Sequence, residues 1–357
     1  MSHLFVAVTA HGYGHLAQVA PVIDALRARL PDLRVTLQST LPAAVVHARL
    51  GTVRHLPQAA DVALPMDGPL AVCWDEGLAL YEAFEAEYDI HLARQQALLA
   101  TERPALVLAD VPWLPLDAAR RFGIPAVALC SLNWYDILAE GPVGARLSPA
   151  LAARLRTVYA AADLFIRPAP SMPMPWLPNA RAVGPIAARR PRDPAGLRAR
   201  LGLAPECQLV LMQFGGTGHV PLNAAFSLPG VHILTPDAAA ATGPNRHLVG
   251  GPGLTVLEVL ASCDALLTKP GYGTFAEAAC NGVPVLYARR DDWPETAALV
   301  AWLARQVPTR AVTADDLAAG DIAAPLTELL TAAPVAPVAP TGARECAELL
   351  LPWLHDQ

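Results

Sequence analysis

The chain has 357 residues, a formal net charge of −6 and hydrophobic residues at 54% of its positions. The length suggests two domains with separate cores, and the negative charge argues against a general nucleic-acid-binding protein. No apolar run approaches the roughly 18 residues of a membrane span, and no basic leader precedes the first apolar run, so we expect a soluble protein.

The first half alternates apolar segments typical of strands with segments of helical periodicity. Strands are predicted at residues 3–8, 34–37, 105–109 and 125–129, and helices at 16–30, 42–50, 81–99 and 114–122. This alternation predicts a parallel sheet with right-handed crossovers. His11, His15, Asp110 and Asn133 follow predicted strands, so we expect them at the carboxyl edge of the sheet, where functional groups gather.

The middle of the chain is rich in proline, which predicts a linker. Five prolines fall within residues 168–178, and a second proline-bearing run follows, so we place the linker at 181–195. The same alternation then restarts, with strands predicted at 208–214, 231–235, 265–268 and 284–287. The expected domains are 1–180 and 196–340, and a last helix within 341–357 has room to cross back to the first domain.

A glycine-rich loop at residues 269–274 joins the strand at 265–268 to a short helix. Gly271 and Gly273 let the backbone turn sharply and approach a ligand closely, and the helix N-terminus favours negative charge. Lys269, the sole lysine of the chain, stands at the edge of this loop. The pattern predicts an anion site.

A structural alternative competes for the same residues. Thr274 and Glu277 have the spacing of a capping box, in which the glutamate only bonds to the Thr274 amide. The six cysteines have no spacing typical of a zinc site, and we interpret them as reduced thiols of a cytoplasmic protein.

These motifs carry a resemblance to a known family. Lys-x-Gly-Tyr-Gly-Thr-x-x-Glu at residues 269–277, with Gly-Val-Pro at 282–284 and Arg-Arg-Asp at 289–291, resembles the donor-binding region of nucleotide-sugar glycosyltransferases of the GT-B fold, family 28-like. The His-Gly-Tyr-Gly-His loop at 11–15 resembles their acceptor-side loop. With Phe-Gly-Gly at 214–216, these stretches are most similar to the glycosyltransferase-like domain of plant L-arabinokinases. The resemblance implies an α/β fold of two Rossmann-like, doubly wound domains facing across a cleft.

The resemblance also implies roles for individual residues. Glu277 would accept hydrogen bonds from the ribose of a nucleoside diphosphate sugar, with uridine favoured as the base. Nucleotide and diphosphate contacts are expected from Gly215, Gly216, Thr217, Lys269, Gly271, Tyr272, Gly273 and Thr274; donor-sugar contacts from Arg289, Arg290, Asp291, Asp292 and Glu295; and acceptor-side contacts from Gly12, Tyr13, Gly14, Asn133 and Trp134. Many relatives carry glutamine near the position of Glu295, so the identity of the sugar stays open.

For catalysis, the acceptor hydroxyl needs a base, and histidine suits neutral pH. His15 is the first candidate and His11 the second, while Asp110 would orient the imidazole and stabilise its charged form. The chain has no Asp-x-Asp motif, so we expect no essential metal and no cofactor. We expect no nucleic-acid partner, and membrane contact only if the acceptor is lipid-linked, through the apolar run 172–177.

Other readings of the same loops remain open. Relatives of this architecture hydrolyse or epimerise nucleotide sugars, and a non-catalytic nucleotide-sugar-binding module is a third reading. Gly12-x-Gly14-x-x-Ala17 also matches a dinucleotide fingerprint, but residues 38–40 lack the expected acidic residue, which disfavours an NAD enzyme. A P-loop ending in Gly-Lys-Ser/Thr is absent from the sequence, which disfavours an ATPase.

Overall fold

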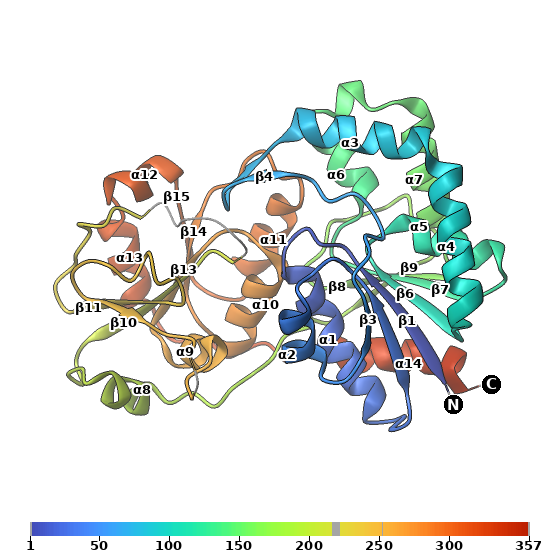
Figure 1. Ribbon diagram of the computed structural model, residues 1–357. Helices are drawn as coiled ribbons and strands as arrows, with labels where there is room; N and C mark the ends of the chain where they lie inside the picture. Colours follow the sequence, from blue (N-terminus) through green and yellow to red (C-terminus); the bar gives the residue numbers. More distant parts are fainter. Residues whose placement is uncertain (1, 216–221, 252, 356–357) are drawn as a thin grey trace.

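The computed structural model describes residues 2–215, 222–251 and 253–355 and has two α/β domains, each built on a parallel sheet (Figure 1). The first sheet has seven strands in the order β3-β2-β1-β6-β7-β8-β9, and the second has six in the order β12-β11-β10-β13-β14-β15. Helices pack against both faces of each sheet, as in doubly wound folds. The predicted fold class is confirmed.

The first domain begins with a strand that is buried at all six positions, because helices cover both faces of its sheet. The strands of this domain are β1 (His3–Val8), β2 (Arg34–Gln38), β3 (Arg54–Leu56), β4 (Met66–Asp67), β5 (Ala71–Val72), β6 (Leu106–Asp110), β7 (Ala126–Leu129), β8 (Leu164–Pro168) and β9 (Ala180–Val183). Its helices are α1 (Gly14–Arg27), α2 (Ala43–Leu50), α3 (Trp74–Ala86), α4 (Tyr88–Glu102), α5 (Trp113–Arg121), α6 (Trp134–Glu140), the 3₁₀ helix η1 (Gly144–Arg146) and α7 (Pro149–Ala161).

The second domain repeats this alternation of strands and helices. Its strands are β10 (Gln208–Gln213), β11 (Val231–Thr235), β12 (Arg246–Leu248), β13 (Ala265–Thr268), β14 (Val285–Ala288) and β15 (Thr309–Val312). Its helices are α8 (Pro194–Leu201), α9 (Val256–Ser262), α10 (Tyr272–Asn281), α11 (Glu295–Leu303), α12 (Ala314–Ala319) and α13 (Ala323–Leu330).

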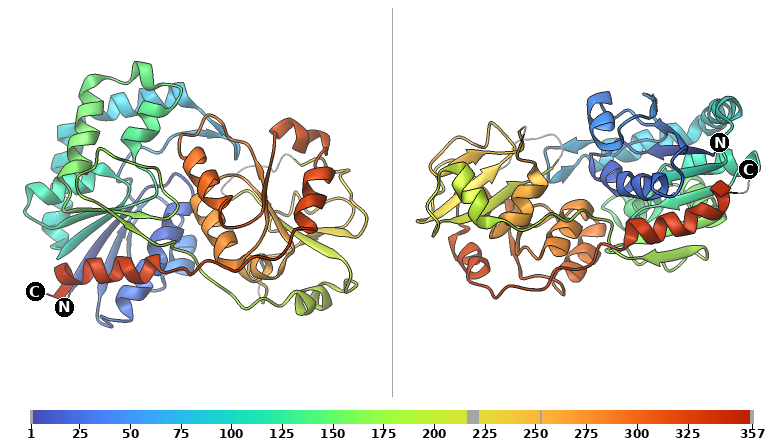
Figure 2. Two further views of the ribbon diagram at one scale, coloured as in Figure 1. Left: turned by 180° about the vertical axis from the view of Figure 1, so that it is seen from behind. Right: turned by 90° about the horizontal axis from the view of Figure 1, so that it is seen from below.

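The last helix, α14 (Gly342–His355), returns to the first domain and packs beside α1 (Figure 2). It buries Cys346, Leu350 and Leu354, and these side chains belong to a hydrophobic core that continues through both domains. At the junction the hydroxyl of Tyr272, in α10, accepts a hydrogen bond of 2.9 Å from the amide of Ile186. The two domains are therefore joined by packing as well as by the chain.

Two sequence predictions need correction. The single helix expected at 81–99 is two helices, α3 and α4, because Glu87 between them has non-helical backbone angles (φ −105°, ψ 15°). The proline-rich residues 168–178 connect β8 to β9 at the edge of the first domain's sheet, and they include the apolar run expected to contact a lipid-linked acceptor. Met172 and Met174 in this run are each only 2% exposed, so they are core residues and not a surface for lipid.

The strand order places the functional loops. In each sheet the order reverses beside the first strand of the domain, between β1 and β6 and between β10 and β13. Loops that leave neighbouring strands in opposite directions open a crevice at such a point. The loops after β1 and β13, which carry the histidines and Lys269, therefore meet at the cleft between the domains. Among the described residues no helix has the length and apolar character needed to cross a membrane.

Candidate active site

A cleft of about 880 Å³ lies between the two domains at the carboxyl ends of their strands. The first domain contributes residues 11–15, Gln18, Arg49 and Ser131 to its lining. The second domain contributes the ends of β10, β11, β13 and β14 and the start of α10. A cavity of this size accommodates a nucleotide and a sugar.

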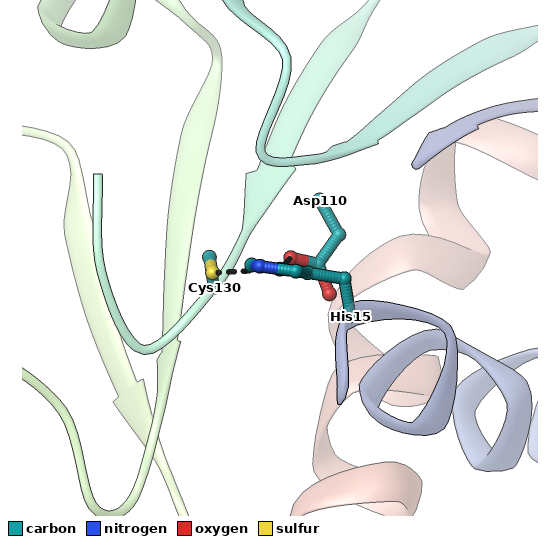
Figure 3. Close-up of side chains that lie close together, drawn as sticks. All are labelled: His15, Asp110 and Cys130. Carbon is teal, nitrogen blue, oxygen red and sulfur yellow. Dashed lines mark hydrogen bonds and ion pairs between the residues drawn. The ribbon is translucent and has the colours of Figure 1, made fainter. Parts of the chain in front are cut away.

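The first domain presents a histidine paired with a buried aspartate (Figure 3). His15 opens the first turn of α1, and its Nδ1 lies 2.9 Å from Oδ1 of Asp110, the last residue of β6. A carboxylate only accepts hydrogen bonds, so this contact assigns the imidazole proton to Nδ1. The other ring nitrogen, Nε2, is then the basic one, on a side chain that lines the cleft.

Burial and charge act in opposite directions on this pair. Burial lowers the pKa of His15, but the charge and hydrogen bond of Asp110, together with the nearby Glu295 and Asp61, more than offset it, so the pKa of His15 is raised above its usual value. Burial raises the pKa of Asp110, and the hydrogen bonds from His15 and Cys130 limit that rise. The arrangement is that of a general base whose protonated form is stabilised by an anion.

Cys130 completes a group of three side chains whose ligand-type atoms all lie within 4.8 Å of one another. Its Sγ is 3.7 Å from Nδ1 of His15, so a metal held by these atoms would have to replace the His15–Asp110 hydrogen bond. Burial raises the pKa of Cys130 well above its usual value, which keeps the thiol protonated, whereas a metal binds the thiolate. The residues present fit a hydrogen-bonded pair better than a metal site.

The other histidine of the loop, His11, is held in its neutral form. Nδ1 of His11 lies 3.1 Å from the carbonyl oxygen of Leu64, and its ring stacks on Trp293 with centroids 5.3 Å apart. Burial, with His15 and Arg290 nearby, lowers the pKa of His11 to about 3. His11 is thus a weaker base than His15 and positions the loop against the second domain.

The second domain presents the N-terminus of α10 to the cleft. No side chain caps this helix, because Gly271 is its N-cap and Thr274 lies inside its first turn. The capping-box alternative is therefore wrong, and the amides of this turn are open to a ligand. Gly271 has extended backbone (φ −159°) and is not needed for a turn, while a Cβ at Gly273 would meet no atom within 4 Å.

Glu277 lies one turn further along α10 and lines the same cleft. Burial raises the pKa of Glu277 to about 7, and the guanidinium groups of Arg49 and Arg190 limit the rise. A desolvated carboxylate without a capping role is a strong acceptor for a ligand's hydroxyl groups.

Two cations, the half-buried Lys269 and the buried Arg290, lie beside this helix. Lys269 follows β13, and burial together with Arg290 lowers its pKa to about 8, so it keeps its proton at neutral pH. Arg290 follows β14 and is 6% exposed. Both contact the β4–β5 segment that reaches over from the first domain (Figure 1): Nζ of Lys269 donates to the carbonyl of Pro69 at 2.9 Å, and Arg290 lies 3.5 Å from Sδ of Met66.

Glu295 links the two walls of the cleft. It begins α11, and it accepts hydrogen bonds from the hydroxyl of Ser131, at 2.6 Å, and from Nε1 of Trp293, at 3.2 Å. Ser131 belongs to the first domain and directly follows Cys130, so this bond ties the start of α11 in the second domain to the His15 site.

Most predicted site residues line the cleft, and six do not. The lining includes His11, Gly12, Tyr13, Gly14, His15, Gly215, Lys269, Gly271, Tyr272, Gly273, Thr274, Glu277, Arg290 and Glu295. Gly216 and Thr217 lie outside the described residues. Asp110, Asn133, Trp134, Arg289, Asp291 and Asp292 are absent from the lining.

Asp110 has the environment that was expected, and the other five do not. Asp110 acts from behind His15, as its orienting role requires. Asn133 caps α6 by accepting from the amide of Asp136, and Trp134 is fully buried with Nε1 donating to Asp61, so neither can touch an acceptor. The other three also fail as sugar contacts because Arg289 and Asp291 pair with each other on the surface and Asp292 accepts from Trp74.

Sequence reasoning missed several lining residues. Arg49, at the end of α2, faces the cleft from a helix that showed only an apolar stripe, and Gln18 and Ser131 carry no motif. Trp293 sits within a stretch singled out for its acidic residues, yet its ring packs against both His11 and Arg290. The sequence did offer one signal for Trp293, because it is a tryptophan that lies among charged residues after a buried strand.

Two plant proteins are similar in sequence to parts of this chain. No protein-family model matches the chain. An L-arabinokinase of Arabidopsis thaliana is 25% identical over 313 residues, 82% of this chain and 29% of that protein. A chloroplastic monogalactosyldiacylglycerol synthase of Spinacia oleracea is 28% identical over 125 residues, 29% of this chain and 24% of that protein. The chain thus spans less than a third of the length of the curated relatives it matches.

Solved structures match over almost the whole chain. The calicheamicin glycosyltransferase superposes with a TM-score of 0.63 at 19% identity, covering 99% of this chain and 94% of that one. A glycosyltransferase, VinC, in complex with dTDP gives 0.58 at 19%, covering 99% and 95%. A putative UDP-N-acetylglucosamine 2-epimerase from Listeria monocytogenes gives 0.55 at 15%, covering 98% and 95%. The chain has the GT-B fold of two facing Rossmann-like domains, and the predicted resemblance to glycosyltransferases of this fold and to plant L-arabinokinases is confirmed.

Proposed function

We propose that the protein is a glycosyltransferase that moves a sugar from a nucleoside diphosphate, with uridine the expected base, to an acceptor hydroxyl. The observation that carries the proposal is the position of the His15–Asp110 pair on one wall of the cleft and of the uncapped α10 N-terminus with Glu277 on the other. A base and an anion site on facing walls are what displacement of a diphosphate by an alcohol requires.

The residues divide the chemistry between the domains. Nε2 of His15 takes the proton of the acceptor hydroxyl, the oxygen attacks the anomeric carbon, and the bond from that carbon to the diphosphate oxygen breaks. The leaving diphosphate gains charge, which the amides of α10 and the ammonium of Lys269 stabilise. Glu277 holds the ribose hydroxyls. One displacement of this kind inverts the configuration of the sugar.

This assignment does without an essential metal. A divalent ion would otherwise neutralise the diphosphate, but the ammonium of Lys269 and the uncapped N-terminus of α10 already present positive charge to it. Metal independence therefore follows from the same charges that make the anion site.

Epimerisation or hydrolysis of the nucleotide sugar is the second candidate, because the putative epimerase shares the fold. These two reactions and transfer, three in all, differ in whether they need an acceptor alcohol and in what they release. Hydrolysis releases the nucleoside diphosphate in water without any alcohol. Epimerisation changes the sugar of the nucleotide sugar, also without an alcohol. Transfer releases the nucleoside diphosphate only when an acceptor alcohol is present.

A release assay separates these functions. The purified protein is incubated in EDTA with UDP-glucose or UDP-glucuronate, first alone and then with methyl glucoside, a phenolic alcohol or diacylglycerol vesicles. We expect UDP release that depends on one alcohol and is unchanged when Mg²⁺ replaces EDTA. Release without an alcohol supports hydrolysis, conversion of the sugar supports epimerisation, and loss of all activity in EDTA contradicts metal independence.

A further inference from the structure

Arg290 is a buried cation that forms no ion pair with any described residue, although the carboxylates of Asp292 and Glu295 are near enough to limit the fall in its pKa that burial causes. Its side chain belongs to a residue that is 6% exposed, and its Nε has no hydrogen-bond partner among the described residues. The contact of its terminal nitrogen is the thioether of Met66 at 3.5 Å, a weak acceptor. Burying a guanidinium without an anion is costly, so a residue of this kind facing a cleft indicates an anionic ligand.

The surroundings of Arg290 distinguish it from the other cleft cations. Its guanidinium lies 4.3 Å from the ring centroid of Trp293, and the same ring stacks on His11. Arg49 lies instead near Glu277, where the nucleotide is assigned, and the ammonium of Lys269, which is near Arg290, already donates a hydrogen bond to the Pro69 carbonyl. The transferred sugar would lie between the diphosphate and His15, and Arg290 and Trp293 lie beside His11, the other histidine of the His15 loop.

We propose that Arg290 binds a carboxylate on the donor sugar, so that the donor is a nucleoside diphosphate uronic acid. This inference rests on the proposed function, since it assumes a nucleotide sugar in the cleft. A guanidinium matches a carboxylate with two parallel N–H···O hydrogen bonds, and stacking on Trp293 fixes the plane of the fork. Glu295, engaged by Ser131 and Trp293, is held in place to receive the sugar's hydroxyl groups.

Matched ligands test the inference on the wild-type protein. UDP-glucuronate and UDP-glucose differ only at C6, as do UDP-galacturonate and UDP-galactose, and calorimetric titration at pH 7 gives the affinity of each. We expect one uronate to bind about tenfold or more tightly than its neutral partner, as a charge-assisted bidentate contact predicts. Equal affinities within both pairs contradict the inference.

Substitutions of Arg290 test whether this residue causes the preference for uronates. Arg290→Gln should remove the difference between uronate and hexose while the affinity for UDP alone changes by less than about threefold, and Arg290→Lys should retain part of the difference because it keeps the charge without the fork. Arg310→Gln removes an exposed guanidinium of the same domain, which pairs with Glu328, and controls for net charge. If Arg290→Gln does not fold, the wild-type pairs and Arg290→Lys carry the test.

The outcomes also separate this inference from the function on which it rests. A fall in UDP affinity equal to the fall in UDP-glucuronate affinity in Arg290→Gln makes Arg290 a diphosphate ligand and overturns the inference. Tight UDP binding without preference for uronates overturns it and leaves the proposed transferase. Absence of binding for UDP and all four nucleotide sugars contradicts the proposed function and the inference together.

Discussion

Replacement of His15 by glutamine is expected to lower turnover by about 10²- to 10⁴-fold, the usual contribution of a general base. The nucleotide should still bind, because the residues assigned to it lie on the second domain and His15 on the first. Glutamine fills much of the space of the buried imidazole and keeps a polar group beside Asp110, so the fold should persist. Steady-state release of UDP and calorimetric affinity for UDP measure the two effects separately.

His91 offers the matched control. It is a histidine of α4, outside the lining of the cleft, and its ring stacks on Phe84. His91→Gln should therefore leave turnover within about threefold of wild type. A His15→Gln protein that is folded, binds UDP and retains most of the wild-type rate would show that His15 is not the base, and His11 would then be the next residue to test.

Substitution of Asp110 by asparagine is expected to lower the plateau rate by about 10²-fold or more while preserving shape and burial. The amide no longer guarantees an acceptor for the Nδ1 proton, so the imidazole loses both its tautomer and the anion that stabilises its protonated form.

The pH dependence of the rate shows a second consequence of the Asp110→Asn substitution. In the wild type the rate should fall on acidification at a higher pH than an ordinary histidine would give. The reason is that the pKa of His15 is raised and the base works only when deprotonated.

The sign of the pH shift follows from the charge that is removed. Without the carboxylate, burial is the dominant influence on His15 and lowers its pKa, so the acid limb of Asp110→Asn should move to lower pH. A rate-against-pH profile from pH 5 to 9, with the melting temperature as a check on folding, measures both effects. A lower plateau with an unmoved acid limb would mean that another group controls the profile.

The architecture could be predicted because strands, helices and glycine loops each leave a pattern in a short stretch of sequence. The spacing of the apolar residues gives the strands and helices, and the glycines mark the loops. Strand ends could be read from the apolar runs before His11, Asp110 and Lys269, and the topology of doubly wound sheets then brings such residues to one edge. The pairing of His15 with Asp110, 95 positions apart, followed from this rule and is present at 2.9 Å.

The predictions of site residues were wrong where tertiary packing decides which way a side chain points. Asn133 follows a strand as the histidines do, but its side chain caps α6, and Trp134 turns into the core toward Asp61. Arg289 and Arg290 are adjacent and identical in type, yet one is exposed and the other buried, because neighbouring residues after a strand point to opposite sides. No local pattern distinguishes such pairs.

The central claim is that a nucleoside diphosphate binds between α10 and the first domain through Glu277. The most direct test is calorimetric titration of the metal-free protein with UDP, GDP, dTDP and ADP, for the wild type, Glu277→Gln and the control Glu348→Gln, an exposed glutamate of α14. We predict that one diphosphate, UDP first, binds the wild type and the control equally and Glu277→Gln about tenfold or more weakly. Binding that is equal in all three proteins, or absent for all four nucleotides in the wild type, would contradict the claim.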